Sequence, residues 1–231
     1  MRVNRWTETH SFNISWVDMN IEAAYSRWSA IYDTNTNRTR DLEGAVAHDF
    51  LSSHKFTDAL EMGCGTGKNT AWLQTKCDRV ISVDLTQAML DIAATKVNSP
   101  HVTFVKADMV ETPWTSFVTS KVDLVTFSLV LEHVQDLNVV FEQADRVLKA
   151  GGRVYVGELH PMKQITGTKA RFESAATGRV EEVTCYTHHT SDFVGAAMAR
   201  GWTLERLDER FDQDDRTQLP RILGLLFRKG C

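Results

Sequence analysis

The sequence predicts a doubly wound α/β fold, in which a mostly parallel β-sheet carries helices on both of its faces. Short apolar runs alternate with helical segments of roughly ten residues, as in repeated strand–helix units. A glycine-rich loop follows the first apolar run, and acidic residues close the next two. The 231 residues are 42% hydrophobic and 24% charged, which is typical of a globular domain with a sizeable core.

The first fifth of the chain is expected to form an arm and a helical cap. Residues 1–20 are polar and aromatic with little periodicity, so we expect a mobile arm or lid there. Apolar and aromatic side chains at helical spacing predict a helix over 21–32, with Tyr25, Trp28 and Tyr32 on one face. A polar break at 33–40 precedes a second helix at 42–51. The predicted units are therefore a cap over 1–52 and a main domain over 53–231.

The main domain alternates regularly. Its expected strands lie at 58–62, 79–84, 102–106, 122–128, 153–158, 203–210 and 221–227, and its expected helices at 68–76, 87–97, 138–148 and 191–200. Ligands of such sheets bind at the carboxyl ends of the strands. The connection over 159–190 is far longer than usual and contains a plausible hairpin, from 170–174 to 179–186, so we expect it to cover a substrate.

Composition excludes several classes of function. The formal net charge is −4, from 26 basic and 30 acidic residues, which disfavours general nucleic-acid binding. No apolar run approaches the roughly 18 residues of a membrane-spanning helix, and no secretory signal opens the chain. The four cysteines have no paired spacing, which favours a reduced, cytoplasmic protein with free thiols and no structural metal.

The glycine loop over 59–67 reads ALEMGCGTG, and three interpretations compete for it. Walker-type phosphate binding fails, because three residues instead of four separate Gly63 from Gly67 and Asn69 follows Lys68. A dinucleotide site fits poorly, because Lys68 stands where the third glycine should be. A tight strand-to-helix turn without a ligand also remains open.

Two acidic residues strengthen the nucleotide interpretation. Asp84 closes the second strand 21 residues after Gly63, where a carboxylate can accept hydrogen bonds from both hydroxyls of a ribose. Asp108 follows the third strand, where it could meet an adenine edge. A single aspartate at a strand end is usually a turn or helix cap, but two after consecutive strands favour a ligand site.

The sequence resembles the class I S-adenosylmethionine-dependent methyltransferases, and most closely the branch that methylates small molecules. The resemblance covers about residues 20–228 and rests on ordered motifs: EMGCGTG at 61–67, Asp84, ADM at 107–109, SLVLEHV at 128–134 and LKAGG at 148–152. It implies a Rossmann-like sheet of seven strands in the order 3-2-1-4-5-7-6, with the last strand antiparallel.

The resemblance also implies roles for individual residues toward S-adenosylmethionine. The methionine moiety would lie over Glu61, Gly63, Cys64 and Gly65. Asp84 would hold the ribose hydroxyls, and Leu85 would lie beside the adenine. Asp108 would accept a hydrogen bond from the adenine amino group, and Met109 would pack on the ring. Ser128 and Leu129 would line the site. His133 matches a position that is often histidine in related enzymes, where helix packing and catalysis are both plausible.

The cap and the long connection supply further candidates. Tyr25 and Tyr32 would face the cofactor sulfonium, which aromatic rings attract, although a core role is common for such helical stripes. Arg40 would bind the cofactor carboxylate, or remain a solvated surface residue. We predict His160 in the acceptor pocket and His188 or His189 as general base or as the residue that orients the acceptor. Glu158 is a weaker candidate. Contacts to loop carbonyls are the competing interpretation for all three histidines.

The predicted activity is methyl transfer by in-line displacement to an O- or N-nucleophile of a small biosynthetic metabolite. Carbon methylation and a module that binds the cofactor without transferring methyl remain alternatives, and a nicotinamide oxidoreductase is disfavoured by the glycine spacing. The motif typical of nucleic-acid base methyltransferases after strand four is replaced by SLVL at 128–131. We expect no nucleic-acid or membrane partner, and a monomer or homodimer.

Overall fold

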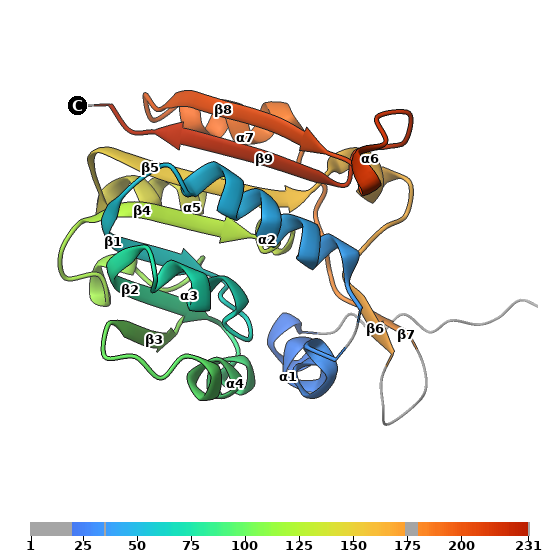
Figure 1. The fold of residues 1–231 in the computed structure, drawn as a ribbon, viewed down its shortest axis with the longest axis horizontal. Helices are drawn as coiled ribbons and strands as arrows, with labels where there is room; N and C mark the ends of the chain where they lie inside the picture. Colours follow the sequence, from blue (N-terminus) through green and yellow to red (C-terminus); the bar gives the residue numbers. More distant parts are fainter. Residues whose placement is uncertain (1–19, 35, 174–179, 231) are drawn as a thin grey trace, which may run out of the picture.

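A seven-stranded sheet forms the centre of the protein in the computed structural model, which describes residues 20–34, 36–173 and 180–230 (Figure 1). The strands run in the spatial order β3-β2-β1-β4-β5-β9-β8. Their bounds are Phe56–Met62 for β1, Cys77–Asp84 for β2, Val102–Lys106 for β3, Val122–Ser128 for β4, Leu148–Leu159 for β5, Thr203–Arg210 for β8 and Ile222–Arg228 for β9. Strands β1 to β5 are parallel, and β9 is antiparallel to both neighbours. The predicted sheet order and its antiparallel last strand are confirmed.

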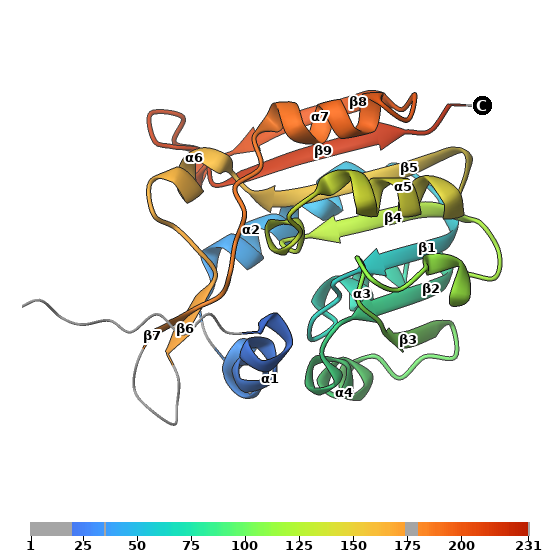
Figure 2. The same cartoon turned by 180° about the vertical axis from the view of Figure 1, so that it is seen from behind.

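Helices cover both faces of the sheet, as predicted. On one face lie α2 (Arg38–Leu51) and α3 (Lys68–Leu73), in front of the sheet in Figure 1. On the other lie α5 (Leu137–Val147) and α7 (Thr190–Met198), seen in front in Figure 2. Each face has its own apolar core, one around Phe127 and Phe141 and the other around Phe50 and Leu124. Adjacent strand residues point to opposite faces, so both sides of β4 are buried.

The strand register brings the expected site residues into one row. Met62 pairs with Val83 on one side and with Phe127 on the other. The next residue of each strand or loop, Gly63, Asp84 and Ser128, therefore lies at the same carboxyl edge of the sheet. Strand β3 pairs Lys106 with Asp84, so the chain after β3 also leaves at this edge.

The N-terminal cap is the helix α1 (Ile21–Tyr32), which lies beside α4 (Gln87–Lys96) near the carboxyl ends of the strands (Figures 1 and 2). Asn20 caps the start of α1 by accepting a hydrogen bond from the backbone N–H of Glu22 at 2.9 Å. Trp28 and Ala24 form a small apolar cluster with Val183. This cluster attaches α1 to the long connection after β5 rather than to the central core.

Helix α2 and strand β5 begin several residues before their predicted starts, and one helix was not predicted. Helix α2 begins at Arg38 inside the expected polar break, because Asn37 accepts a hydrogen bond from the backbone N–H of Arg40 at 3.0 Å and so caps it. Strand β5 begins at Leu148, which pairs with Val122 of β4 ahead of a shift in register. The long connection contains a short helix, α6 (Pro161–Ile165), that the sequence analysis did not anticipate.

The expected hairpin in the long connection is present as β6 (Arg171–Glu173) and β7 (Val180–Glu182), with Arg171 paired to Glu182. The predicted turn between them and residues 1–19 of the predicted arm at 1–20 lie outside the described residues. Within the described part of the chain, no helix is both long and apolar enough to cross a membrane.

Candidate active site

A cavity of about 330 Å³ opens at the carboxyl edge of the sheet, at the position where strand ends were predicted to carry chemistry. Its wall comes from the loops after β1, β2, β3 and β4, from α1, and from the segment that follows β7. Ten of the residues predicted to bind the cofactor line it: Tyr25, Tyr32, Gly63, Gly65, Asp84, Leu85, Asp108, Met109, Ser128 and Leu129. Glu61, Cys64 and Arg40 are not among the described residues of the wall.

The glycine loop is bent so that its backbone faces the cavity. Gly63 and Gly65 both have positive φ angles, of 74° and 51°. The backbone N–H groups of Gly63 and Cys64 donate to the Val83 carbonyl at 2.8 and 2.9 Å, which fixes the loop to β2. A Cβ atom on Gly63 would lie 2.4 Å from Cγ2 of Val130, whereas one on Gly65 would meet nothing within 4 Å. Gly65 therefore leaves open space on the cavity side of the loop.

Asp84 is held by the loops around it. One carboxylate oxygen accepts from the backbone N–H of Gly65 at 2.9 Å, and the other accepts from that of Thr86 at 2.8 Å. Burial raises the pKa of Asp84 above its usual value. The Thr86 side chain and the backbone N–H of Leu85 also hydrogen-bond this carboxylate, so local donors hold it in place at the cavity wall.

Asp108 both caps a turn and lines the cavity. Its Oδ1 accepts from the backbone N–H groups of Val110 at 2.7 Å and Glu111 at 3.2 Å. The capping role anticipated for a strand-end aspartate is thus present, and it orients the side chain beside Met109 in the wall.

Glu61 lies beneath the glycine loop. Its Oε2 accepts hydrogen bonds from the hydroxyls of Thr70 and Ser82, and burial raises the pKa of Glu61 to about 7. Glu61 thus ties β1 to β2 and α3 in the described structure.

Arg40 is directed toward α1. Its guanidinium donates to the Tyr32 carbonyl and lies 5.4 Å from the centroid of the Tyr32 ring. Arg40 belongs to α2, and these contacts join it to Tyr32, the last residue of the helix that covers the cavity.

Polar contacts at both ends of α1 hold it over the cavity. Glu22 forms an ion pair with Lys106 at 2.7 Å, at the end of β3. Asp33, just after α1, accepts from the Thr66 hydroxyl of the glycine loop at 2.8 Å and pairs with Lys96 of α4. Between these contacts, Ile21, Tyr25 and Tyr32 contribute to the cavity wall.

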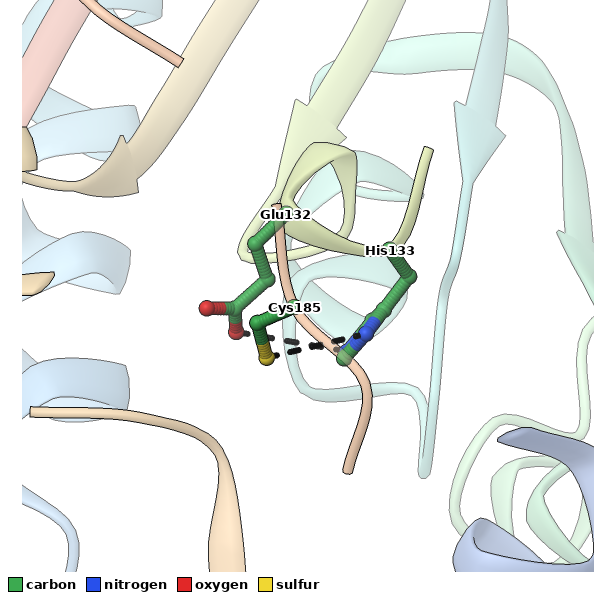
Figure 3. A group of neighbouring side chains, drawn as sticks. All are labelled: Glu132, His133 and Cys185. Atoms are coloured by element: carbon green, nitrogen blue, oxygen red, sulfur yellow. Dashed lines mark hydrogen bonds and ion pairs between the residues drawn. The ribbon is translucent and has the colours of Figure 1, made fainter. Parts of the chain in front are cut away.

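A histidine of the SLVLEHV segment completes the wall opposite the glycine loop. His133 ends the short helix η2 (Leu131–His133), and its Nε2 lies 2.7 Å from the hydroxyl of Tyr25. Its Nδ1 lies 2.9 Å from the carbonyl of Thr184. Figure 3 shows the side chains of Glu132 and His133 beside Cys185. The sequence analysis had left His133 open between packing and catalysis, and it did not anticipate the Tyr25 partner.

The three histidines predicted for catalysis are not brought to the cavity. His160 is 3% exposed and caps the start of α6, with Nδ1 accepting from the backbone N–H of Met162 and Nε2 3.0 Å from Glu209. His188 donates from Nε2 to the Val134 carbonyl at 2.7 Å. The backbone N–H of His189, at the start of α7, donates to Asp192 at 2.7 Å. These contacts correspond to the competing interpretation, in which the histidines satisfy local backbone and loop groups.

Glu158, the weaker catalytic candidate, is also buried away from the wall. Its Oε1 accepts from the backbone N–H groups of Val130 at 2.9 Å and Leu131 at 2.8 Å, so it supports the loop after β4. Burial raises the pKa of Glu158 to about 8. The wall instead includes Thr86, Met89, Gln135 and Tyr186, which sequence reasoning missed. Of these four residues, Tyr186 alone lies in a segment, 159–190, that the sequence analysis expected to cover a substrate.

Comparisons with known proteins agree with this architecture. Residues 60–156 match the family model described as a methyltransferase domain. This match includes the end of β1, the EMGCGTG segment, Asp84, Asp108 and the SLVLEHV segment. Residues 60–156 therefore form a methyltransferase domain, and the predicted resemblance to S-adenosylmethionine-dependent methyltransferases is confirmed.

Among curated proteins, the chain is 32% identical over 142 residues to the biotin biosynthesis bifunctional protein BioHC of Cellvibrio japonicus, covering 61% of this chain and 27% of that protein. It is 28% identical over 139 residues to a malonyl-[acyl-carrier protein] O-methyltransferase of Serratia marcescens, covering 60% and 52%. The matches thus span about a quarter and half of these relatives. Among solved structures, the DhpI–SAH complex superposes with a TM-score of 0.70 at 23% identity, covering 90% of this chain and 94% of that one. This last similarity concerns the fold.

Proposed function

We propose that this methyltransferase transfers the methyl group of S-adenosylmethionine to an O- or N-nucleophile of a small biosynthetic metabolite. The observation that carries the proposal is the chemistry of the cavity wall. The wall has the carboxyl groups of Asp84, Asp108 and Glu111 and three tyrosine rings, and no lysine or arginine among its described residues. Carboxylates and aromatic faces attract a sulfonium, whereas the pyrophosphate of a dinucleotide would lack a cationic partner there.

The residues present fit the cofactor at its adenosine end. Asp84 lines the cavity with its carboxylate held in place by backbone N–H groups, and a carboxylate there suits the two hydroxyls of a ribose. Leu85 and Met109 would pack against the adenine, and Asp108 would accept a hydrogen bond from the adenine amino group. Gly65 leaves open space toward the cavity, where the methionine moiety would approach the backbone. When bound, the cofactor supplies an electrophilic methyl group.

The chain's own contribution is alignment and exclusion of water. Helix α1 covers the cavity and is fixed at both ends, by Glu22 to Lys106 and by Asp33 to Thr66. Holding two reactants in line and away from water supplies much of the rate of such a displacement. A proton must also be removed where the acceptor carries one.

The acceptor would lie near α1 and the segment after β7, whose Ile21, Tyr25 and Tyr186 share the cavity wall. Methylation of carbon is the alternative outcome at the same site. Free cysteines at positions 64, 77 and 185 suit the cytoplasm, and we expect a monomer or homodimer without nucleic-acid or membrane partners.

Calorimetry and a transfer assay test the proposal together. We expect S-adenosylmethionine and S-adenosylhomocysteine to bind and NAD not to bind. Incubation of the protein with methyl-labelled S-adenosylmethionine and fractionated small metabolites should then label one class of compound. Binding without transfer to any fraction would favour the second candidate, a module that holds the cofactor without using it. Binding of NAD alone would exclude both.

A further inference from the structure

The hydrogen bonds of His133 define which of its ring nitrogens is free to accept a proton. A carbonyl oxygen can only accept, so the contact of Nδ1 with the Thr184 carbonyl at 2.9 Å places a hydrogen on Nδ1. In the neutral ring, Nε2 then carries a lone pair. The Tyr25 hydroxyl, 2.7 Å from Nε2, therefore donates its hydrogen to that nitrogen.

Both members of this pair line the cavity, and they come from segments more than a hundred residues apart. Burial raises the pKa of Tyr25 well above its usual range, so the phenol keeps its own proton at neutral pH. Tyr25 can accept a proton from an acceptor only if it passes its own proton on at the same time. The lone pair of His133 Nε2 receives it.

Glu132 lies beside this pair in a position from which water is largely excluded. Its Oε1 is 4.0 Å from Nε2 of His133, and the side chains of both residues are 8% exposed. Cys185 and Tyr186 are the other titratable side chains of the adjoining segment, and Asp84 and Tyr32 act on Tyr25 through their charges.

We propose that Tyr25 and His133 form a proton relay that deprotonates the methyl acceptor. The relay rests on the proposed function. As the acceptor oxygen bonds to the methyl carbon, the carbon–sulfur bond breaks and its electron pair stays on sulfur. The acceptor proton moves to the Tyr25 oxygen, and the Tyr25 proton moves to Nε2. The products are a methyl ether, a thioether and the imidazolium of His133, which Thr184 and Glu132 stabilise.

A metal ion is the competing use of the same side chains. Glu132, His133 and Cys185 offer ligand atoms that all lie within 4.8 Å of one another (Figure 3). A metal binds imidazole along the lone pair of a nitrogen, and both nitrogens already face an oxygen, of Thr184 or Tyr25. A bound metal and the relay therefore exclude each other, which makes metal content part of the test.

The first experiment needs no acceptor. In protein with ¹⁵N-labelled histidine and bound S-adenosylhomocysteine, we expect His133 to show a protonated Nδ1 and an unprotonated Nε2. Tyr25→Phe should shift the Nε2 resonance, and Tyr32→Phe, which removes a hydroxyl from the same helix, should not. A protonated Nε2, a resonance unmoved by Tyr25→Phe, or stoichiometric zinc lost with Cys185→Ser would overturn the relay. This result decides the proposal even for an enzyme that methylates none of the probes below.

The second experiment uses phenol and 4-nitrophenol as probe acceptors, the latter largely ionised at neutral pH. Tyr25→Phe and His133→Gln should lower kcat for phenol about 10²-fold or more, and for 4-nitrophenol much less. Methyl iodide can methylate the sulfur of bound S-adenosylhomocysteine and release iodide, a reaction that needs no base. The rate of this reaction should stay within a few-fold of that of the unsubstituted protein in both variants. His101→Gln, on the exposed surface, is the matched control. Equal losses for both phenols would refute the relay, while failure to bind S-adenosylhomocysteine would refute the proposed function instead.

Discussion

Gly63 and Gly65 share the left-handed conformation, but substituting them should impair different properties of the protein. A Cβ on Gly63 would lie 2.4 Å from Cγ2 of Val130, and a Cβ on Gly65 would enter open space in the cavity. We therefore expect Gly63→Ala to destabilise the fold and Gly65→Val to impair cofactor binding. Comparing these two variants separates the contribution of the loop to stability from its contribution to ligand binding.

The magnitudes follow from the geometry. An L-residue in the left-handed region costs roughly 1–2 kcal/mol, which applies to alanine at either position. Overpacking against Val130 adds about 1–3 kcal/mol at position 63 only. For a chain of this size each kcal/mol lowers Tm by roughly 2–4 °C, so Gly63→Ala should lose roughly 4–20 °C and Gly65→Ala roughly 2–8 °C.

Thermal denaturation and calorimetry with S-adenosylhomocysteine measure the two effects separately. Gly65→Val should raise Kd at least about tenfold, because a branched side chain takes space that the ligand needs. The double variant Gly63→Ala/Val130→Ala should recover only part of the lost Tm, since Cβ of Val130 would still lie 2.8 Å away. Equal thermal losses in Gly63→Ala and Gly65→Ala, or unchanged affinity in folded Gly65→Val, would refute this account of the loop.

Three further predictions concern single carboxyl groups. Asp84→Ala should weaken S-adenosylhomocysteine binding by about 1–3 kcal/mol, because the ribose hydroxyls lose their acceptor, and calorimetry on the folded variant checks it. Asp33→Ala should raise Kd a few-fold and speed hydrogen exchange in α1, since the helix loses its contact with Thr66, whereas the exposed Asp91→Ala should do neither. The raised pKa of Glu158 means that the folded state binds its proton more tightly than the unfolded state, so stability should fall as pH rises from about 4.5 to about 8. Tm measured from pH 5 to 9 should fall less in Glu158→Gln, and an unchanged slope would exclude Glu158 as the cause.

The sheet and the cofactor side of the cavity were predictable because both depend on local sequence patterns. Apolar runs separated by helical segments fix a parallel sheet, and residues after strand ends meet at one edge of it. Asp84 and Asp108 follow β2 and β3 directly, so their place required no knowledge of distant contacts. Glu61 shows the limit of this reasoning, since β1 turns its side chain to Ser82 and Thr70 rather than to the cavity.

The acceptor side was not predictable to the same degree, because it depends on contacts between distant segments. His160 was expected in the pocket for its position after β5, but the following Pro161 begins a helix that His160 caps. His133 reaches the cavity through its contact with Tyr25, and no local pattern connects those two positions. The proline after His160 was the one available signal that this histidine had a capping role.

The position of Tyr25 on α1 links closure of the cavity to its chemistry. Helix α1 carries Tyr25 in its second turn, while contacts to Lys106 and Thr66 hold its two ends. The contact with His133 requires α1 in this position over the cavity, so the proposed proton relay depends on the same placement of the helix that excludes water. An undocked α1 would leave Nε2 of His133 without its Tyr25 partner and the reacting groups exposed to water. The covering helix is therefore part of the proposed catalytic apparatus as well as a lid, and variants that loosen it should lower turnover more than they lower the affinity for S-adenosylhomocysteine.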